Sequence, residues 1–416
     1  MITFRKFESE TNCHKVKPDF NHKSHKMQNS INRRRFLKLT AAGAAGGFIA
    51  GSGAVNAASL KDVTTLKKGE VMHRTLGRTG LKVPLVNLGF VRSDNPRIIN
   101  YGLDLGMTLI DTAHGYSNGR NEEVLGELLK NRPRDSYILA TRVRGNTEEQ
   151  ILEQFNISLE RLQLDYVDIL GLHGSSSREH TLDEARLKAF TKIKAQGRAR
   201  FLSVSTHSNE PEVIRAVAES NVYDLVYTSY NFRMDNFPDL KKAIDEAAEA
   251  GIGIIAMKTM AGAYWDRERQ DPINLTAALK WALQNPNIHS TIPGVESFNE
   301  LEENFEANYN IDLSPGELND LRLDQADRGM FCLGCEKCID QCPKKLPVPD
   351  IMRSYMYAYG YKSPALARET MDSLSLGDDA CKDCSSCSVK CLQGFDVAEK
   401  IKDINRIKAV PNEFLA

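Results

Sequence analysis

Long hydrophobic runs, glycine-rich phosphate loops and an excess of basic charge are all missing from this sequence of 416 residues. No apolar run reaches the eighteen or so uninterrupted residues of a membrane-spanning helix, so we expect no span in the mature protein. No G-x-G-x-x-G motif occurs, which argues against a doubly wound, dinucleotide-binding sheet. The composition, 41% hydrophobic and 26% charged, is that of a globular protein with two or three domains.

The overall charge of -1 conceals a difference between the N-terminal segment and the rest. Residues 1–57 carry ten Lys or Arg and three Asp or Glu, which leaves 44 basic and 52 acidic residues, a balance of -8, for residues 58–416. This acidic remainder has no basic stripe, so we expect no nucleic-acid partner.

The N-terminal segment has the pattern of an export signal. The pair Arg33-Arg34 is followed one residue later by Phe-Leu-Lys and an Ala- and Gly-rich apolar run, with a cleavage site after Ala57. We predict that residues 1–57 are a leader and twin-arginine signal, that the twin-arginine translocase is a partner during export, and that the mature protein is periplasmic. The alternative is a basic tail beside a short apolar helix.

Eight of the nine cysteines lie in two short runs near the C-terminus. Both runs have the spacing C-x-x-C-x-x-C-x-x-x-C, and a proline follows the first run. In two-cluster ferredoxins of this spacing, the fourth cysteine of a run binds the other cluster. We therefore predict two 4Fe-4S clusters with crossed ligands, held by Cys332, Cys335, Cys338, Cys342, Cys381, Cys384, Cys387 and Cys391.

Other uses of these cysteines stay open: one cluster beside a degenerate site, structural zinc, or disulfides. Disulfides fit poorly, because cysteines two residues apart rarely reach bridging geometry without strain. Zinc sites usually take pairs of cysteines rather than a run of four.

The residues between the two runs have helical patterns at 348–361 and 365–376. We predict that residues 326–416 form a mainly α-helical, dicluster ferredoxin-like domain. A stripe at helical spacing we interpret as core that covers the clusters, the alternative being an electron path; it consists of Met352, Tyr355, Met356 and Tyr359.

Ahead of this domain, β-branched runs alternate with amphipathic helical patterns. Eight strands, nearly all followed by a helix, predict an α/β fold, a (β/α)8 TIM barrel over residues 71–325, with a hairpin at 72–83. The predicted strands are 85–90, 108–111, 137–142, 167–173, 201–205, 225–229, 253–258 and 289–293. The predicted helices are 121–130, 147–162, 182–195, 212–219, 240–248, 275–283 and 299–305.

Ionisable side chains fall where three successive strands end, the face of a barrel that carries its chemistry. Asp111 ends the second strand and Tyr116 follows it, Arg142 ends the third strand, and His173 ends the fourth. We expect these four side chains to converge. Taken singly, Asp111 could be a strand-end cap and His173 a core histidine.

Residues 72–305 resemble an aldo-keto reductase. The resemblance rests on Asp-Thr-Ala-x-x-Tyr, which ends at Tyr116, and on Glu-Glu-Val-Leu-Gly at 122–126. It implies that Tyr116 donates a proton to a carbonyl oxygen while hydride arrives from a nicotinamide. It also implies that Asp111 holds a cation that lowers the pKa of the tyrosine, and that His173 orients the carbonyl.

Arg142 stands where the family has its catalytic lysine. Arginine keeps the positive charge but does not give up a proton, so it can tune Tyr116 without joining a proton relay. We therefore expect altered turnover rates and intact cofactor binding.

The resemblance implies a nicotinamide cofactor, NAD(H) or NADP(H). Glu300 falls where NADP-dependent members have an arginine for the 2′-phosphate, which favours NAD, and Tyr227 replaces the usual glutamine near the nicotinamide amide. The cofactor-binding residues that the resemblance implies are Ser205, Tyr230, Lys258, Pro293, Gly294, Glu300 and Asn304.

Barrel, cysteine runs and signal together resemble the iron–sulfur subgroup of bacterial aldo-keto reductases. We predict an oxidoreductase that moves hydride between nicotinamide and a small carbonyl or alcohol substrate, coupled to electron transfer through the clusters and to a redox partner protein. The alternative is an exported iron–sulfur electron-transfer protein whose barrel is a non-catalytic scaffold. A third reading gives the clusters a structural role on a working enzyme.

Overall fold

Eight parallel strands follow one another in chain order around a single sheet in the computed structural model. They are β3 (Leu88–Gly89), β4 (Leu109–Asp111), β5 (Ile138–Val143), β6 (Val167–Ser175), β7 (Ala199–Thr206), β8 (Leu225–Ser229), β9 (Gly253–Met257) and β10 (Ser290–Thr291). Parallel bridges from Val86 to Thr291 and from Gly89 to Gly294 join the first strand to the last and close the sheet. The predicted α/β fold with eight parallel strands is confirmed, although the first and last strands are shorter than predicted.

The structure describes residues 70–90, 94–234, 236–266, 269–323, 332, 334, 336–361, 363–377, 380–381, 384, 387–391 and 394–415. The predicted export signal at 1–57 and the predicted ligand Cys335 lie outside these ranges. All described residues belong to one structural unit, residues 65–416. Among them, no helix has the length and apolar character needed to cross a membrane.

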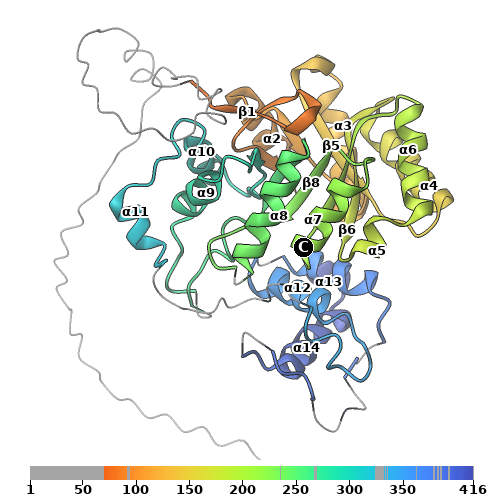
Figure 1. Cartoon of the computed structure of the whole chain (residues 1–416), viewed down its shortest axis with the longest axis vertical. Coiled ribbons are helices and arrows are strands. Elements are labelled where there is room, and N and C mark those ends of the chain that lie inside the picture. The colour runs from red at the N-terminus through yellow and green to blue at the C-terminus, as the bar shows by residue number, and fades with distance from the viewer. Residues whose placement is uncertain are drawn as a thin grey trace, which may run out of the picture. The chain divides into compact units, whose positions relative to one another are not determined.

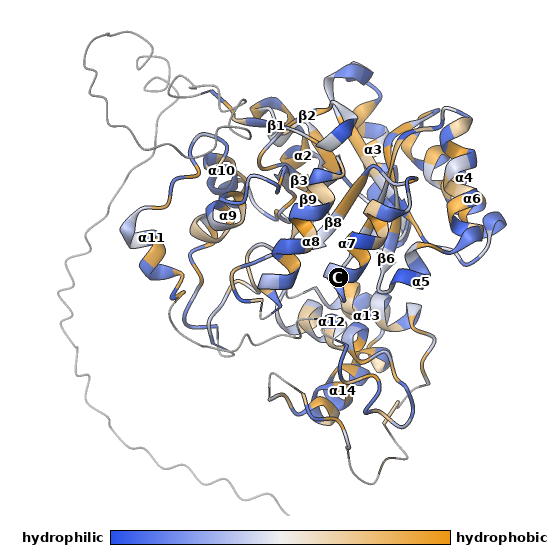
Figure 2. Ribbon diagram, in the orientation of Figure 1, coloured by the Kyte–Doolittle hydropathy of each residue, from blue (hydrophilic) through white to orange (hydrophobic). Residues whose placement is uncertain are grey.

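Helices surround the barrel and pack apolar faces against the strands. They are α2 (Pro96–Leu105), α3 (Arg120–Leu129), α4 (Glu148–Leu162), α5 (Arg178–Thr181), α6 (Glu184–Ala195), α7 (Glu210–Glu219), α8 (Phe237–Glu249), α9 (Leu275–Leu283), α10 (Phe298–Glu306) and α11 (Pro315–Asp320). Helix α8 shows both hydrophobic and hydrophilic residues along its length (Figure 2), and its buried residues Leu240, Ala243, Ile244 and Ala247 recur at helical spacing.

Helix α2 was missed by the sequence prediction. Its start has clear signals, because Asn95 accepts a hydrogen bond from the backbone N–H of Arg97 and Pro96 takes the first helical position. Its end is marked by Gly106, whose φ of 104° is left-handed. These cap residues would have revealed the helix.

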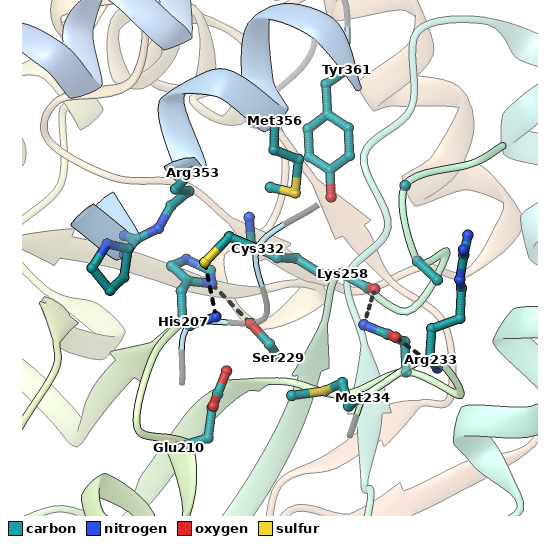
Figure 3. Close-up of a pocket in the computed structure, with 15 residues that line it drawn as sticks. His207, Glu210, Ser229, Arg233, Met234, Lys258, Cys332, Arg353, Met356 and Tyr361 are labelled. Carbon is teal, nitrogen blue, oxygen red and sulfur yellow. Dashed lines mark hydrogen bonds between the residues drawn. The ribbon is translucent and has the colours of Figure 1, made fainter. Parts of the chain in front are cut away.

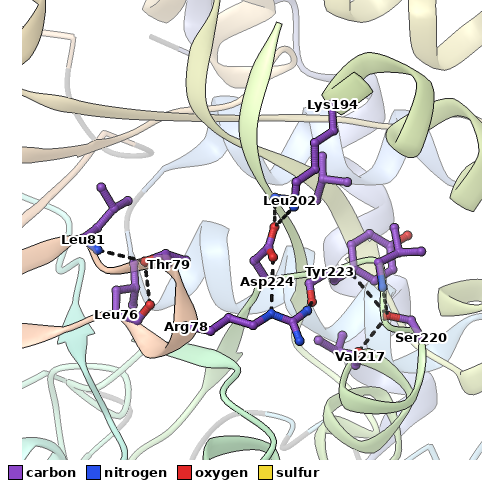
Figure 4. Close-up of polar contacts among 11 residues, drawn as sticks. Leu76, Arg78, Thr79, Leu81, Lys194, Leu202, Val217, Ser220, Tyr223 and Asp224 are labelled. Atoms are coloured by element: carbon purple, nitrogen blue, oxygen red, sulfur yellow. Dashed lines mark hydrogen bonds and ion pairs between the residues drawn. The ribbon is translucent and has the colours of Figure 1, made fainter. Parts of the chain in front are cut away.

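The hairpin that precedes the barrel is confirmed, with β1 (His73–Thr75) antiparallel to β2 (Lys82–Pro84). Its turn fits only glycine at Gly77, where φ is +52° and an added Cβ would lie 2.3 Å from the backbone nitrogen of Gly253. Arg78 donates hydrogen bonds to the carbonyl of Tyr223 (2.7 Å) and to Asp224 (3.4 Å), as Figure 4 shows. Both acceptors precede β8, so the hairpin covers the amino-terminal end of the barrel.

Three C-terminal helices lie together at one end of the barrel (Figure 1): α12 (Val348–Tyr359), α13 (Pro364–Ser373) and α14 (Val397–Asn405). The first two were predicted, and α14 was not. They share a separate apolar core that includes Ile351, Met371 and Ile401. Three members of the predicted Met and Tyr stripe are buried in it, whereas Tyr359 is 45% exposed.

Candidate functional site

The ends of β4, β5 and β6 bring Asp111, Tyr116, Arg142 and His173 together, as the sequence predicted they would converge. Asp111 is the last residue of β4, and Arg142 and His173 lie near the ends of β5 and β6. The backbone N–H of His114 donates to the carbonyl of Arg142 (2.9 Å), which holds the chain between Asp111 and Tyr116 against β5.

Arg142 is the centre of this group. One terminal nitrogen donates to Asp111 Oδ1, and the other donates to Tyr116 Oη at 3.1 Å. Its guanidinium also lies 4.5 Å from the centroid of the Tyr227 ring. Arg142 and Asp111 are both only 2% exposed. A buried ion pair is strongly destabilised when one partner is removed, so this pair fixes the local geometry.

Burial dominates the acid–base properties of the group. It raises the pKa of Asp111 to about 6 against the opposing effect of Arg142. It also raises the pKa of Tyr116 above its usual value, and Arg142 only partly offsets that rise. Arg142 lowers the pKa of Tyr116, as the sequence predicted for a neighbouring cation, but desolvation of the phenolate outweighs that effect and the net shift is upward. At neutral pH, Tyr116 keeps its proton and can donate it.

His173 completes the group as a neutral ring. Its centroid is 5.8 Å from that of Tyr116, with the two rings edge to face. Burial, followed by the charges of Arg144, Arg142 and Arg353, holds the pKa of His173 well below its usual value. It can therefore exchange hydrogen bonds with a ligand oxygen without adding a second positive charge.

The motif at 122–126 supports the site from behind. Thr141, the neighbour of Arg142, donates to Glu122 Oε1 at 2.6 Å. An added Cβ at Gly126 would lie 2.3 Å from the carbonyl oxygen of Arg161 in α4, so only glycine allows α3 to approach α4 this closely. The motif is thus structural, and it keeps β5 and the Tyr116 segment in place.

A cavity of about 370 Å³ opens beside Tyr116, and we call it the barrel-mouth cavity. Its walls include two of the four central residues together with four of the predicted cofactor-binding residues, namely Asp111, Tyr116, Lys258, Pro293, Gly294 and Glu300. The structure therefore brings the predicted proton donor and much of the predicted cofactor set to one space.

Three predicted cofactor-binding residues do not line this cavity. Ser205 accepts a hydrogen bond from the backbone N–H of Gly174 (3.0 Å), and Tyr230 stacks on Trp281 in the core. Asn304 is 3% exposed, and its Nδ2 has no partner among the described residues. The structure thus gives the first two residues packing and hydrogen-bonding partners within the protein.

The C-terminal helices contribute cavity residues that the sequence interpretation missed. Tyr357 and Tyr361 line the barrel-mouth cavity, and the ammonium of Lys258 lies 4.6 and 5.6 Å from their ring centroids. Lys258 also donates to Tyr357 Oη at 3.4 Å. Arg353 and Tyr357 lie four residues apart on α12, Tyr361 follows the end of this helix, and all three line pockets against the barrel.

A smaller pocket of about 60 Å³ lies where the first cysteine run meets the barrel (Figure 3), and we call it the Cys332 pocket. Cys332 Sγ accepts from the backbone N–H of Gly334 (3.3 Å), whose carbonyl accepts from the backbone of Asn209 (3.2 Å). His207, Lys258 and Tyr361 line both this pocket and the barrel-mouth cavity. These three residues separate the cysteine run from the proton donor.

The two cysteine runs lie side by side. The carbonyl of Gln341 accepts from Ser388 Oγ (2.6 Å), and its side-chain oxygen accepts from the backbone N–H of Lys390 (2.7 Å). Cys342 and Cys391 immediately follow Gln341 and Lys390, and both are free thiols, as are Cys384 and Cys387.

Within the described part of the chain, no three Cys, His, Asp or Glu side chains converge closely enough to hold a metal ion. The side-by-side runs and the thiolate chemistry suit iron–sulfur ligation, and the described geometry does not assemble a ligand set.

Comparison with known proteins shows which family and which folds this chain is similar to. Residues 85–276 match the family described as Aldo/keto reductase family. An uncharacterized oxidoreductase of Bacillus subtilis, YqkF, is 27% identical over 280 residues, which is 56% of this chain and 90% of that protein. In fold, the chain is similar to the holo form of an aldo-keto reductase from Bacillus halodurans, with a TM-score of 0.52, 24% identity, and coverage of 62% of this chain and 97% of that one. It is also similar to an aldo/keto reductase from Klebsiella pneumoniae in complex with NADP and acetate, with a TM-score of 0.51 and 23% identity. That similarity covers 63% of this chain and 96% of the other.

Proposed function

The chain belongs to the aldo/keto reductase family over residues 85–276, and on this premise we propose that it transfers hydride between a nicotinamide cofactor and a small carbonyl compound. It is an NAD(P)-dependent oxidoreductase. One observation carries the proposal: Arg142 holds Asp111 and Tyr116 together on the wall of a cavity that also contains predicted cofactor-binding residues.

The barrel-mouth cavity suits a nucleotide cofactor. Lys258 lines it, with a pKa that burial and then the charge of Arg353 hold well below the usual value for lysine, and Gly294 has no side chain to hinder a close approach. A bound nicotinamide supplies the hydride. Glu300 lines the same cavity, and its carboxylate accepts from the backbone N–H of Glu296 (2.7 Å). A carboxylate held there repels a 2′-phosphate, which supports NAD over NADP.

The residues of this chain then handle the proton. Tyr116 donates its phenolic proton to the carbonyl oxygen as negative charge develops there. Arg142 stabilises the resulting phenolate through the hydrogen bond that it already makes, and Asp111 keeps the guanidinium in place. The neutral His173 ring positions the carbonyl oxygen. Arg142 remains protonated throughout, so the proton that restores Tyr116 comes from solvent or another acid.

The decisive test measures nucleotide binding and aldehyde reduction by the full-length protein after anaerobic purification. We expect NADH or NADPH to bind and a generic aldehyde to be reduced. A protein that binds nucleotide without reducing any carbonyl would support the alternative, an exported electron-transfer protein with a scaffold barrel.

We also propose that the two cysteine runs hold two 4Fe-4S clusters and that the clusters exchange electrons with the barrel and with a redox partner protein. The cysteine spacing supports the clusters, and the hydrogen bonds of Gln341 support a joint arrangement of the two runs. The residues shared by the Cys332 pocket and the barrel-mouth cavity support exchange between them. Iron and sulfide analysis with electron paramagnetic resonance tests the clusters, and reduction of their signal by substrate tests the exchange.

Export by the twin-arginine route to the periplasm remains part of this proposal. It is supported by the paired arginines at 33–34, and it agrees with a cofactor that must be inserted before translocation.

A further inference from the structure

A polar cavity of about 540 Å³ lies against His173, and we call it the His173 cavity. The ring of His173 contacts the ring of Tyr116, which lines the barrel-mouth cavity. Tyr116 lines the barrel-mouth cavity and His173 lines the His173 cavity, so this pair of touching rings stands between the two cavities. A cofactor in the barrel-mouth cavity would lie beside Tyr116, and a ligand in the His173 cavity would lie beside the His173 ring that contacts it.

The loop between β5 and α4 presents Arg144 to the His173 cavity in a fixed position. The backbone N–H of Arg144 donates to Gln154 Oε1 (2.9 Å). The guanidinium of Arg186 in α6 donates to the carbonyl of Gly145 (3.0 Å) and to the side-chain oxygen of Asn146 (2.6 Å). Two helices thus hold the backbone on both sides of Arg144, while its own side chain forms no ion pair within the described residues.

The lining of this cavity carries two arginines, Arg144 and Arg353, and two carboxylates, Asp350 and Glu153, while Glu369 of α13 interacts with Arg144. Arg353 is paired with Asp350 (2.5 Å), and Glu153 is exposed on α4. Burial lowers the pKa of His180 to about 4, so this ring is neutral at physiological pH. The charges that act on His173 come from Arg144, Arg142 and Arg353, and all three are positive. An oxyanion that enters the cavity is attracted toward the reacting centre.

The C-terminal helices complete the walls of this cavity. Asp350 and Arg353 come from α12, and Thr370 and Ser373 come from α13. Between them and the barrel loops, polar or charged side chains make up most of the lining, with Leu172 and Leu374 among them. Such a space favours a short, polar ligand over the large apolar carbonyl compounds that an open barrel mouth would admit.

We propose that the His173 cavity is the substrate site and that Arg144, aided by Arg353, selects short carbonyl compounds that carry a carboxylate or a phosphate group. This inference rests on the proposed hydride transfer. Hydride adds to the carbonyl carbon with its electron pair, the C=O π bond breaks, and the oxygen takes the proton of Tyr116. The products are the hydroxy acid or hydroxy phosphate and the oxidised nicotinamide, and solvent restores the proton of Tyr116.

The test compares kcat/KM for charged and neutral substrates. Succinic semialdehyde and glyceraldehyde 3-phosphate are the charged probes, and butyraldehyde and glyceraldehyde are their neutral counterparts. We expect the wild type to favour at least one charged probe, and Arg144→Met to reduce that preference by about ten- to a hundredfold, mainly through KM. Preference for succinic semialdehyde or for glyceraldehyde 3-phosphate identifies the anionic group. The matched control is Arg97→Met, on the exposed start of α2, which should retain the preference.

A second measurement separates this inference from the proposed function. Calorimetry follows the binding of succinate and of inorganic phosphate to the nucleotide-free wild type and to Arg144→Met. Anion binding that requires Arg144, without any carbonyl reduction, would support the site and refute the hydride transfer. Reduction of neutral and charged probes with equal kcat/KM, unchanged in Arg144→Met, would overturn the inference and leave the proposed function intact.

Discussion

Arg142 donates a hydrogen bond to the hydroxyl of Tyr116 at 3.1 Å while its other terminal nitrogen binds Asp111. A planar guanidinium can serve both partners at once, which a single ammonium group does less well. The face of the guanidinium lies against Tyr227. Arg142 and Tyr227 are two positions where the sequence departs from the pattern it resembles, and in the structure these two side chains touch. The two departures therefore form one coupled arrangement.

Replacing Tyr116 by Phe removes one hydroxyl and leaves the ring in contact with His173. Because general acid catalysis contributes roughly two to four orders of magnitude, carbonyl reduction should fall by about that much. Nucleotide binding, measured by quenching of protein fluorescence, should stay near the wild-type value. Equal reduction rates for both proteins would remove Tyr116 from the mechanism.

Arg142→Lys should lower kcat by about tenfold, because an ammonium group cannot stack on the Tyr227 ring as the guanidinium does. The buried Tyr227 hydroxyl, which has no hydrogen-bond partner among the described residues, then also loses its neighbouring guanidinium. The double variant Arg142→Lys with Tyr227→Gln should recover part of the loss, since the shorter side chain gives the ammonium room and polar contact. Steady-state rates of the four proteins form a double-mutant cycle. Strictly additive effects would show that the two positions act independently.

The convergence of Asp111, Tyr116, Arg142 and His173 was predictable because parallel strands of a barrel end on one face, so residues at three successive strand ends must approach one another. The direction of the Tyr116 pKa shift could not be predicted from the sequence, since it depends on burial that arises when other elements cover the site. The position of Tyr357 and Tyr361 in the cavity wall could not be predicted from the sequence either. Helix α12 carries two stripes at helical spacing, and nothing local shows which one faces the barrel. Ser205 lies near the end of β7 and Tyr230 follows β8, as expected, yet their side chains are engaged in backbone contacts or packing.

Glu369 of α13 predicts a specific pH dependence of stability. Its carboxyl oxygen would lie 2.8 Å from a Cβ placed on Gly115, and burial raises its pKa to about 7, with Arg144 opposing the rise. Between the unfolded pKa near 4.5 and the folded value, the folded protein binds more protons, so this group makes stability fall as pH rises through that window. Glu369→Gln should therefore lose less stability than the wild type between pH 5 and pH 8.

Melting temperatures at several pH values check this prediction. The matched control is Asp372→Asn, which removes a more exposed carboxylate from the same helix and should leave the pH slope near that of the wild type. An unchanged slope in Glu369→Gln would mean that the carboxyl group is hydrated in solution.

Export should depend on the paired arginines at 33 and 34. Arg33→Lys combined with Arg34→Lys keeps the charge and removes the recognition pattern of the twin-arginine translocase. We expect the variant to stay in the cytoplasm with its leader uncleaved, whereas the wild type reaches the periplasm with its leader removed near Ala57. Cell fractionation with intact-mass measurement distinguishes the two. A double variant that is found in the periplasm with its leader removed would refute the export proposal.

Gln341 accepts hydrogen bonds from Ser388 and Lys390, so Cys342 and Cys391, the fourth cysteines of the two runs, each follow a residue of this contact, which agrees with crossed ligation. In that arrangement, Cys342 binds the cluster of Cys381, Cys384 and Cys387. Cys342→Ser should then lose about half of the bound iron, and adding Cys381→Ser should lose little more, because both changes affect one cluster.

Adding Cys332→Ser to Cys342→Ser should instead remove nearly all the iron, because the two changes then affect both clusters. Iron and acid-labile sulfide, measured with the paramagnetic signal of each variant, report the result. The opposite pattern, in which Cys332→Ser adds nothing and Cys381→Ser removes the remainder, would place Cys342 on the cluster of its own run. Gln341→Ala provides the structural control, since it keeps all eight cysteines and removes the side-chain bonds to Lys390 and to the carbonyl of Lys337. It should retain both clusters in freshly purified protein and lose them faster on exposure to chelator.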